Sequence, residues 1–337
     1  MTTALTPVLD RSRALVLPAL RAAVDTLDPT SRDVTAYHLG WTDADGSPCA
    51  SGGGKTVRPA LALLSAELAG APAEQAIPGA VAVELVHNFS LLHDDVMDGD
   101  TQRRHRATVW SLWGESCAIL TGDAQLVLAQ QVLCDSGSAH ATAATRLLLG
   151  ATAELIRGQV EDLAFESRDR VTVQECLRMA VGKTGALLSA SAAIGAVLAG
   201  APAGVVAALS AYGRHLGAAF QLVDDLLGIW GDPAVTGKPV LSDLRSRKKS
   251  LPVTWTLAAD DAAAHELAAW YSSPTTDDAG LTRAAELVEI GGGRAWAAAE
   301  ARRRMELAGQ ALAGVRAPAG PRAELLALGR FIVDRDV

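Results

Sequence analysis

Residues 83–98 read Val-Glu-Leu-Val-His-Asn-Phe-Ser-Leu-Leu-His-Asp-Asp-Val-Met-Asp, and this stretch decides the fold. On a helix, Asp94 and Asp98 lie one turn apart on the same face, with Asp95 the next residue round. His87, seven residues before Asp94, shares that face. Three gathered carboxylates repel one another unless a cation joins them, and oxygen ligands on a helix suit Mg²⁺. Because the flanking residues are apolar, this face is interpreted as the wall of a pocket.

Helical patterns dominate the rest of the 337 residues. Apolar residues recur three and four apart, for example over 147–163 and 284–312, and strand-like alternation is nearly absent. We therefore expect an all-α protein with one domain. Its core should span residues 51–337, and residues 1–50 should form an N-terminal lead with a first helix and a polar loop.

Composition excludes several classes of protein. The formal net charge is −8, which argues against a nucleic-acid binder driven by backbone electrostatics. The four cysteines form no CxxC pair, so a reducing, cytoplasmic compartment is expected. The first residues show no signal peptide. Residues 184–213 carry no charge until Arg214, but Gly200 to Gly204 interrupt them, so we expect two buried helices with a turn and no transmembrane segment.

A second acidic pair and several cations complete the chemical inventory. Asp224 and Asp225 are embedded in the apolar stretch 220–228, and buried acids of this kind need partners. The two acid groups could face each other and hold divalent cations between them. Candidate diphosphate ligands lie in several basic runs. These are Lys55 and Arg58 after three glycines, the adjacent pair Arg103 and Arg104 after Asp98, Lys183 before the uncharged stretch, Lys238 after Gly237, and the run Arg247-Lys248-Lys249.

These motifs resemble the trans-isoprenyl diphosphate synthases, or polyprenyl synthetases, and among them the actinobacterial geranylgeranyl diphosphate synthases. The resemblance runs from residue 53 to about residue 252. It rests on GKxxRP at Gly54–Pro59, DDxxD at Asp94–Asp98, GQxxDL at Gly158–Leu163, KT at Lys183–Thr184, the acidic pair Asp224–Asp225 and GK at Gly237–Lys238. It implies a helical bundle of the isoprenoid-synthase type with a central active-site cavity, in a homodimer.

The resemblance also implies a reaction and a set of site residues. The enzyme would condense isopentenyl diphosphate head to tail with an allylic diphosphate, using two or three Mg²⁺ ions. The implied metal ligands are Asp94, Asp95, Asp98, Asp224 and Asp225. The implied isopentenyl diphosphate ligands are Lys55, Arg58, His87 and Arg104. The implied allylic diphosphate ligands are Arg103, Lys183, Lys238 and Lys248. Thr184 and Gln221 offer oxygens to the allylic cation, whose pocket must exclude water.

Three positions depart from the family pattern. Thr56 stands where many members have a third basic residue, and His105 replaces a usual Gly. Gly228 stands where the second acidic motif commonly has its third Asp. The metal site is nevertheless expected to survive, because the first Asp of that motif remains.

Phe89 predicts the product length. It lies five residues before Asp94, about 7.5 Å along the helix, and its neighbour Ser90 is small. An aromatic floor at that depth resembles members that stop at C20, geranylgeranyl diphosphate, although Phe89 could equally be ordinary core. Farnesyl or geranyl diphosphate is the alternative product.

Other classes of protein stay open at this point. A terpene cyclase would share the fold and the first acidic motif, but would normally lack the Lys55, Arg58 and His87 group. An HD-type phosphohydrolase would need further metal-binding His and Asp residues, whose spacing is not found. A non-catalytic subunit of a synthase would usually have lost an acidic motif, whereas both persist here.

Overall fold

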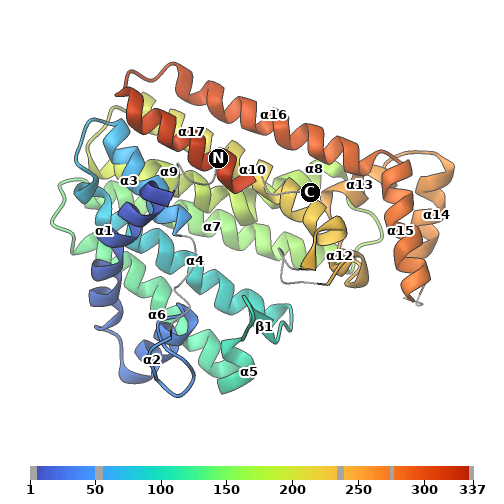
Figure 1. Cartoon of the computed structure of the whole chain (residues 1–337), viewed down its shortest axis with the longest axis horizontal. Helices are drawn as coiled ribbons and strands as arrows, with labels where there is room; N and C mark the ends of the chain where they lie inside the picture. The colour runs from blue at the N-terminus through green and yellow to red at the C-terminus, as the bar shows by residue number, and fades with distance from the viewer. Residues whose placement is uncertain (1–5, 50–55, 234–238, 274–276, 334–337) are drawn as a thin grey trace. The chain divides into compact units, whose positions relative to one another are not determined.

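The computed structural model describes residues 6–49, 56–233, 239–273 and 277–333 (Figure 1). Across these residues, regular structure consists of helices, one two-stranded hairpin and an isolated bridge between Thr42 and Pro48. The all-α prediction is confirmed.

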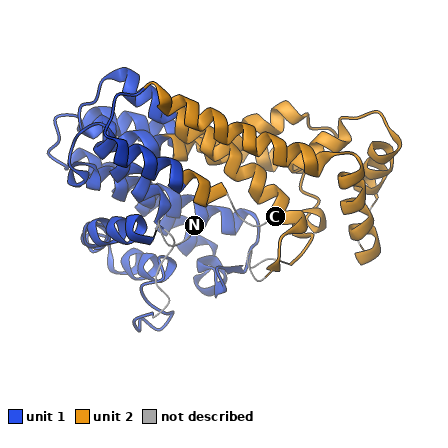
Figure 2. Ribbon diagram, turned by 45° about the horizontal axis from the view of Figure 1, so that its top comes forward, with its two compact units in different colours: residues 1–152, 190–210, 315–328 blue, residues 153–189, 211–314, 329–337 orange. Residues whose placement is uncertain are grey.

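The chain divides into two compact units, which Figure 2 shows in different colours. Unit 1 comprises residues 1–152, 190–210 and 315–328, and unit 2 comprises residues 153–189, 211–314 and 329–337. The division expected at residue 50 stays a prediction.

Unit 1 contains α1 (Thr6–Val24), α2 (Pro29–His38), α3 (Val57–Leu68), the 3₁₀ turn η2 (Ala73–Ala76), α4 (Ile77–Met97), β1 (Gln102–Arg103), β2 (Arg106–Ala107), α5 (Val109–Trp113) and α6 (Glu115–Cys134). Unit 2 contains α8 (Val173–Ala180), the π-helical turn η3 (Val181–Gly185), α12 (Ser242–Arg245), α13 (Leu251–Leu257), α14 (Ala262–Ser272), α15 (Asp278–Ile290) and α16 (Gly293–Ala313). Four helices have residues in both units: α7 (Ala141–Glu166), α9 (Ala186–Leu198), α10 (Ala203–Trp230) and α17 (Ala319–Val333).

Two helices precede residue 50, where the sequence predicted one. The Asp28 carboxylate accepts hydrogen bonds from the backbone N–H groups of Thr30 and Ser31, both at 3.1 Å. Pro29 then opens α2 with a backbone angle already suited to a helix. These capping contacts stabilise α2 although residues 29–38 are mostly polar.

Helix α4 packs closely on α6. The His93 ring lies over Gly122, where a Cβ would be only 2.4 Å from its Nε2. The same Nε2 lies 3.0 Å from the carbonyl O of Ile119. The absence of a side chain at Gly122 therefore lets α4, which carries the first acidic motif, approach α6.

The hairpin that follows α4 has a two-residue loop. Gln102 pairs with Ala107 and Arg103 pairs with Arg106, which leaves Arg104 and His105 as the loop. Their φ angles are +52° and +62°, the left-handed pattern of a type I′ turn. The Arg106 guanidinium lies 4.1 Å from the centre of the Tyr37 ring and donates to the Thr42 carbonyl at 2.7 Å. These contacts tie the hairpin to α2 and to the segment that follows it.

Glycines bring three backbones together in unit 2. A Cβ on Gly158 of α7 would lie 2.2 Å from the backbone N of Lys183 in η3. A Cβ on Gly217 of α10 would lie 2.4 Å from the Cα of Gly185, also in η3. This glycine seam, formed by Gly158, Gly185 and Gly217, holds the turn that carries Lys183 and Thr184.

Two helical stretches, Glu115–Cys134 and Val173–Leu198, are long and apolar enough to cross a membrane by length and composition alone. The fold buries 39% and 72% of their most apolar windows, respectively. After the end of η3 at Gly185, helix α9 ends at Leu198 and α10 begins at Ala203, so the uncharged stretch 184–213 lies mainly in two helices separated by a turn, as the sequence predicted.

Candidate active site

The first acidic motif lies at the C-terminal end of α4 in unit 1. Asp94 is half-buried, Asp95 is buried, and Asp98 is exposed just past the last helical residue. Arg103 of β1 donates from Nε to Asp95 Oδ1 at 2.7 Å. The hairpin therefore folds back so that the Arg103 guanidinium contacts the acidic motif at the end of α4.

Asp95 is only 1% exposed, and its second oxygen has no hydrogen-bond partner among the described residues. Burial raises the pKa of Asp95 to about 6, against the opposing effect of the Arg103 guanidinium. A buried carboxylate oxygen without a donor is costly in free energy unless a cation meets it. Asp95 therefore fits a ligand for a hard divalent cation.

The cations Arg58 and Arg104 form a second group in unit 1. Burial lowers the pKa of Arg58 to about 10, while the Glu84 carboxylate opposes that shift. Burial also lowers the pKa of Arg104, again opposed by Glu84. The Nε of Arg58 is buried without a hydrogen-bond partner among the described residues. A partly desolvated guanidinium with an unused donor, as at Arg58, is suited to binding an anion.

His87 lies beside these arginines in its neutral form. Burial lowers its pKa well below 6.5, and Arg58 and Arg104 lower it further. His38 of α2 has a pKa of about 3 for the same reasons, with burial the largest cause. An uncharged His87 would meet a diphosphate as a hydrogen-bond donor rather than as a cation.

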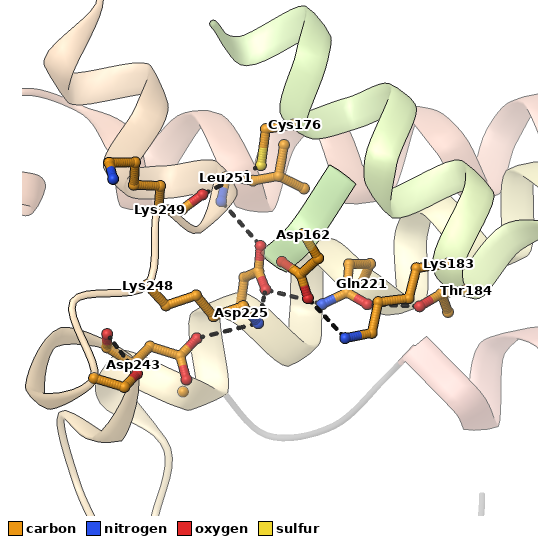
Figure 3. A network of polar contacts seen from close by, with 12 residues as sticks. Asp162, Cys176, Lys183, Thr184, Gln221, Asp225, Asp243, Lys248, Lys249 and Leu251 are labelled. Atoms are coloured by element: carbon orange, nitrogen blue, oxygen red, sulfur yellow. Dashed lines mark hydrogen bonds and ion pairs between the residues drawn. The ribbon is translucent and has the colours of Figure 1, made fainter. Parts of the chain in front are cut away.

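The second acidic motif is the centre of a polar network in unit 2 (Figure 3). Asp225 is 2% exposed, whereas Asp224, its neighbour on α10, is exposed. Asp225 Oδ1 accepts from Gln221 Nε2 at 2.9 Å and from Lys248 Nζ at 3.3 Å. Its Oδ2 accepts from the backbone N–H of Leu251 at 2.9 Å. Asp225 therefore uses both oxygens to hold the residues around it.

Gln221 connects Asp225 to Thr184 through two hydrogen bonds. The Thr184 hydroxyl donates to Gln221 Oε1 at 2.7 Å, and the amide of Gln221 is oriented in turn by Asp225. The two oxygens that the sequence assigned to an allylic cation thus lie together. They come from η3 and α10.

Lys183 and Lys248 are both paired with carboxylates in unit 2. Lys183 Nζ donates to Asp162 Oδ2 at 2.7 Å. Lys248 Nζ lies 3.8 Å from Asp243 Oδ2, in addition to its contact with Asp225. Burial alone would lower the pKa of Lys248, but the surrounding carboxylates, led by Asp225 and Asp243, raise it well above its ordinary value.

Two predicted ligands, Lys55 and Lys238, lie outside the described residues. Thr56, the first residue after that gap, precedes α3 with a φ of +47°, and its buried hydroxyl has no hydrogen-bond partner among the described residues. The expectation that the two acid groups face each other stays a prediction.

The predicted chain-length residues lie in the interior of unit 1. Phe89 is 6% exposed and meets the His93 ring edge to face, with 4.8 Å between ring centres. The Ser90 hydroxyl donates to the carbonyl of His87 at 2.8 Å. The structure therefore places an aromatic ring between the acid motif and the start of α4, and its role as a floor stays a prediction.

Sequence reasoning omitted Glu84, Asp162 and Asp243 from the site. Glu84 is a single acid in the apolar stretch before His87, and its side chain is a partner of Asn88 at 3.3 Å. An isolated acid in an apolar helix is a usable signal for a paired group. Asp162 belongs to the GQxxDL motif already noted, whereas nothing in the local sequence marks Asp243.

Among the described residues, no three His, Cys, Asp or Glu side chains gather closely enough to hold a metal ion by themselves. This arrangement is compatible with Mg²⁺, which takes one or two carboxylates and completes its coordination with water and substrate phosphate oxygens.

Comparison with known proteins agrees with this geometry. A family model described as polyprenyl synthetase matches residues 46–288. The (2E,6E)-farnesyl diphosphate synthase of Mycobacterium tuberculosis (strain ATCC 25618 / H37Rv) is 57% identical over 339 residues, covering 99% of this chain and 94% of the relative. The geranylgeranyl diphosphate synthase of the same strain is 45% identical, covering 98% and 93%.

A solved structure is also closely similar. The polyprenyl synthetase from Streptomyces coelicolor A3(2) superposes with a TM-score of 0.93 at 53% identity, covering 98% of this chain and 99% of that one. Fold, acidic motifs and cations together define an all-α prenyltransferase. The chain belongs to the polyprenyl synthetase family, within which its relatives are short-chain trans-prenyl diphosphate synthases.

Proposed function

We propose that this protein is a Mg²⁺-dependent synthase that condenses isopentenyl diphosphate with an allylic diphosphate to give geranylgeranyl diphosphate. The observation that carries the proposal is the buried oxygen of Asp95, which has no donor while Arg103 holds its partner oxygen. A carboxylate in this state, paired with Arg103 and acting electrostatically on Arg104, suits a magnesium-bound diphosphate.

Each group of residues then has a part in the reaction. Asp94, Asp95 and Asp98 would hold Mg²⁺ in unit 1, and Asp224, with Asp225 as its neighbour, would hold it in unit 2. The bound metal supplies positive charge that stabilises the departing diphosphate. Arg103, Lys183, Lys238 and Lys248 would add to that stabilisation by binding the allylic diphosphate.

The second substrate would be bound by Lys55, Arg58, His87 and Arg104. The neutral His87 donates a hydrogen bond to the diphosphate of isopentenyl diphosphate, while the arginines supply charge. The carbon–oxygen bond of the allylic diphosphate breaks, and the cation is stabilised by the oxygens of Thr184 and Gln221. The isopentenyl double bond attacks the cation, and the released diphosphate takes the proton that is lost.

Farnesyl diphosphate is the second candidate product. The specific observation in its favour is the relative named as a farnesyl diphosphate synthase, whose identity of 57% exceeds the 45% of the geranylgeranyl diphosphate synthase. The argument for C20 rests on the buried ring of Phe89, five residues before Asp94.

The proposed partner is a second copy of the chain, which would form a homodimer. The proposed compartment is the cytoplasm. Helix α6 presents Ile119, Leu120 and Val127 with 42%, 65% and 57% of their surfaces exposed. Large apolar side chains on one helix favour a protein interface over water. A homodimer formed through α6 would cover them.

A product assay tests the proposed function. Purified protein receives Mg²⁺, labelled isopentenyl diphosphate and, separately, the C5, C10 and C15 allylic diphosphates, and the dephosphorylated products are sized. Asp95→Ala should abolish elongation, while Asp33→Ala, at a side chain 70% exposed, should not. A C20 product supports the proposal. A C15 product would show the same condensation reaction with farnesyl diphosphate as the product in place of geranylgeranyl diphosphate. No elongation with any primer would reject the synthase assignment.

A further inference from the structure

Helix α2 ends at a histidine with a buried ring nitrogen that the proposed mechanism does not use. His38 is the last residue of the helix, and its Nε2 atom is buried without a hydrogen-bond partner in the part of the chain that the structure describes. A buried polar atom of this kind is costly in free energy, because it has lost water and gained no other partner. Its presence in the fold therefore points to a partner outside the chain.

Contacts with the hairpin fix the end of α2. The Tyr37 hydroxyl donates to the Ala107 carbonyl of β2 at 2.7 Å, and the Arg106 guanidinium donates to the Tyr37 carbonyl at 3.0 Å. The same guanidinium lies over the Tyr37 ring. His38 follows Tyr37 directly, so its backbone is held against the hairpin that carries the proposed diphosphate ligands.

The neighbours of the His38 ring belong to the group proposed for isopentenyl diphosphate. Burial, the largest cause, and then Arg104 and Arg103 lower the pKa of His38, while Asn88 of α4 raises it. Arg104, which acts on the ring more strongly than Arg103, is a proposed ligand of isopentenyl diphosphate. The His38 ring also acts on His87, another residue of that group.

A neutral imidazole is the kind of ligand that this surrounding favours. It carries one N–H donor and no charge, so it can lie beside Arg104 without the repulsion that a further cation would meet. The guanidinium groups already supply positive charge to an anion bound here. The diphosphate group has more acceptor oxygens than one guanidinium fills, and a neutral donor can bind one of the others.

We propose that His38 is a further binding residue for isopentenyl diphosphate and donates a hydrogen bond from Nε2 to its diphosphate group, beside Arg104. The inference rests on the proposed function for the identity of the substrate. Helix α2 lies before residue 53, where the recognised motifs begin, so the site extends into a segment that those motifs do not cover.

The first experiment measures binding without turnover. Isopentenyl diphosphate is titrated into the full-length protein in a calorimeter, with no allylic diphosphate present. His38→Leu removes the donor and should raise Kd about tenfold, as expected for one lost hydrogen bond to a charged group. His265→Leu makes the same change at a side chain 71% exposed and should leave Kd as it is in the wild type.

The second experiment tests the position of the donor. The amide nitrogen of Gln reaches about as far from the backbone as Nε2 of His, whereas Asn is shorter and places its amide nitrogen close to the position of Nδ1. His38→Gln should therefore recover most of the affinity, and His38→Asn should bind as weakly as His38→Leu. The thermal unfolding midpoint of each variant is recorded as well. If His38 were purely structural, affinity would follow the midpoint and not the position of the donor.

Steady-state kinetics supplies a third readout. His38→Leu should raise KM for isopentenyl diphosphate by a factor similar to the change in Kd. Both kcat and KM for the allylic diphosphate should stay within about twofold of the wild type, because the lost hydrogen bond is made equally in the ground state and the transition state, and to one substrate only.

Two results would overturn the inference. They are a wild-type Kd in His38→Leu, and a folded His38→Gln that binds as weakly as His38→Leu. Failure of the proposed function would look different. A wild-type chain that binds isopentenyl diphosphate through His38 but elongates no primer would reject the synthase assignment alone, whereas a wild-type chain that does not bind isopentenyl diphosphate would reject both.

Discussion

His38 and His87 show how burial sets the charge of single residues in unit 1. Both lie near arginines, and both have pKa values far below 6.5. A neutral imidazole leaves the positive charge of this region to the guanidinium groups. It also makes the stability of the fold depend on pH.

The His38 contribution has a definite sign. Its pKa is about 3 in the folded chain and 6.5 when unperturbed. Below pH 6.5 the unfolded chain therefore binds a proton that the folded chain does not, and stability falls with pH until about pH 3. Between pH 8 and pH 5 the loss from His38 is about 2 kcal/mol.

Denaturant unfolding at several pH values tests this account of His38. Between pH 8 and pH 5, the free energy of unfolding of His38→Gln should fall by about 2 kcal/mol less than that of the wild type. His265→Gln, at a side chain 71% exposed, should leave the slope as it is in the wild type. An unchanged slope in His38→Gln would show that the ring is not held neutral.

Product length should respond to Phe89. Phe89→Ala opens space five residues before Asp94, so the product of the reaction should lengthen by at least one isoprene unit. Phe165→Ala removes a ring that is equally buried, 5% against 6% exposed, but in unit 2, and should cost stability without changing the product. Sizing the dephosphorylated products checks both variants. An unchanged product length in Phe89→Ala would show that Phe89 does not limit the length of the product.

Residue types and spacings made part of the site predictable. Asp94, Asp95 and Asp98 could be assigned to one face because helical spacing is periodic, and Thr184 could be grouped with Gln221 only through a family resemblance. The contact of Asp243 with Gly228 depends on how a loop folds back on a helix, which no local pattern encodes. Charge state was equally hidden, because burial and not sequence sets the pKa of His87.

At the scale of elements, the hairpin after α4 carries strain in its loop. Arg104 and His105 both have positive φ, a conformation in which glycine loses nothing and other residues lose free energy. Arg104 is proposed to bind a diphosphate through its charge, whereas the side chain of His105 has no proposed role. A glycine at position 105 would adopt this conformation without that loss.

His105→Gly should raise the free energy of unfolding by about 0.5–1 kcal/mol, since relief of the left-handed strain exceeds the added flexibility of glycine. Gln102→Gly, in β1 of the same hairpin, lacks that strain and should lower it. Chemical denaturation measures both changes, and a loss of stability in His105→Gly would contradict the strain assigned to the loop.

Helix α7 offers a matched pair of glycines. Gly158→Ala would force its Cβ to 2.2 Å from the Lys183 backbone N, so we expect a loss of several kcal/mol in stability and a lower kcat. Gly150→Ala, on the same helix with nothing within 4 Å of the new Cβ, should instead stabilise by about 0.5–1 kcal/mol. Equal effects at the two positions would mean that α7 and η3 can separate freely.

At the scale of the whole molecule, each unit holds one acidic motif and its own cations. The sequence predicted the helical class, since periodic apolar residues define helices locally. It did not predict the division into units, which falls inside α7, α9, α10 and α17 and follows from contacts between distant residues. Such contacts leave no mark on the composition of the individual helices.

The proposed dimer can be tested on α6. Leu120→Lys places a charge at a side chain 65% exposed, and it should shift the protein from dimer to monomer in analytical ultracentrifugation. Ile290→Lys, at a side chain 68% exposed on α15, should leave the mass unchanged. A dimer that survives Leu120→Lys, or a wild-type monomer, would remove α6 as the interface.

The glycine seam of unit 2 has a consequence for how this protein can vary. At Gly158 and Gly217, backbone already touches backbone, and no amino acid is smaller than glycine. Every substitution there can only widen the gap beside Lys183 and Thr184, and none can narrow it. Mutations at these two positions can therefore only increase the spacing between the backbones. A tighter packing of α7, η3 and α10 could arise solely from changes elsewhere in the chain.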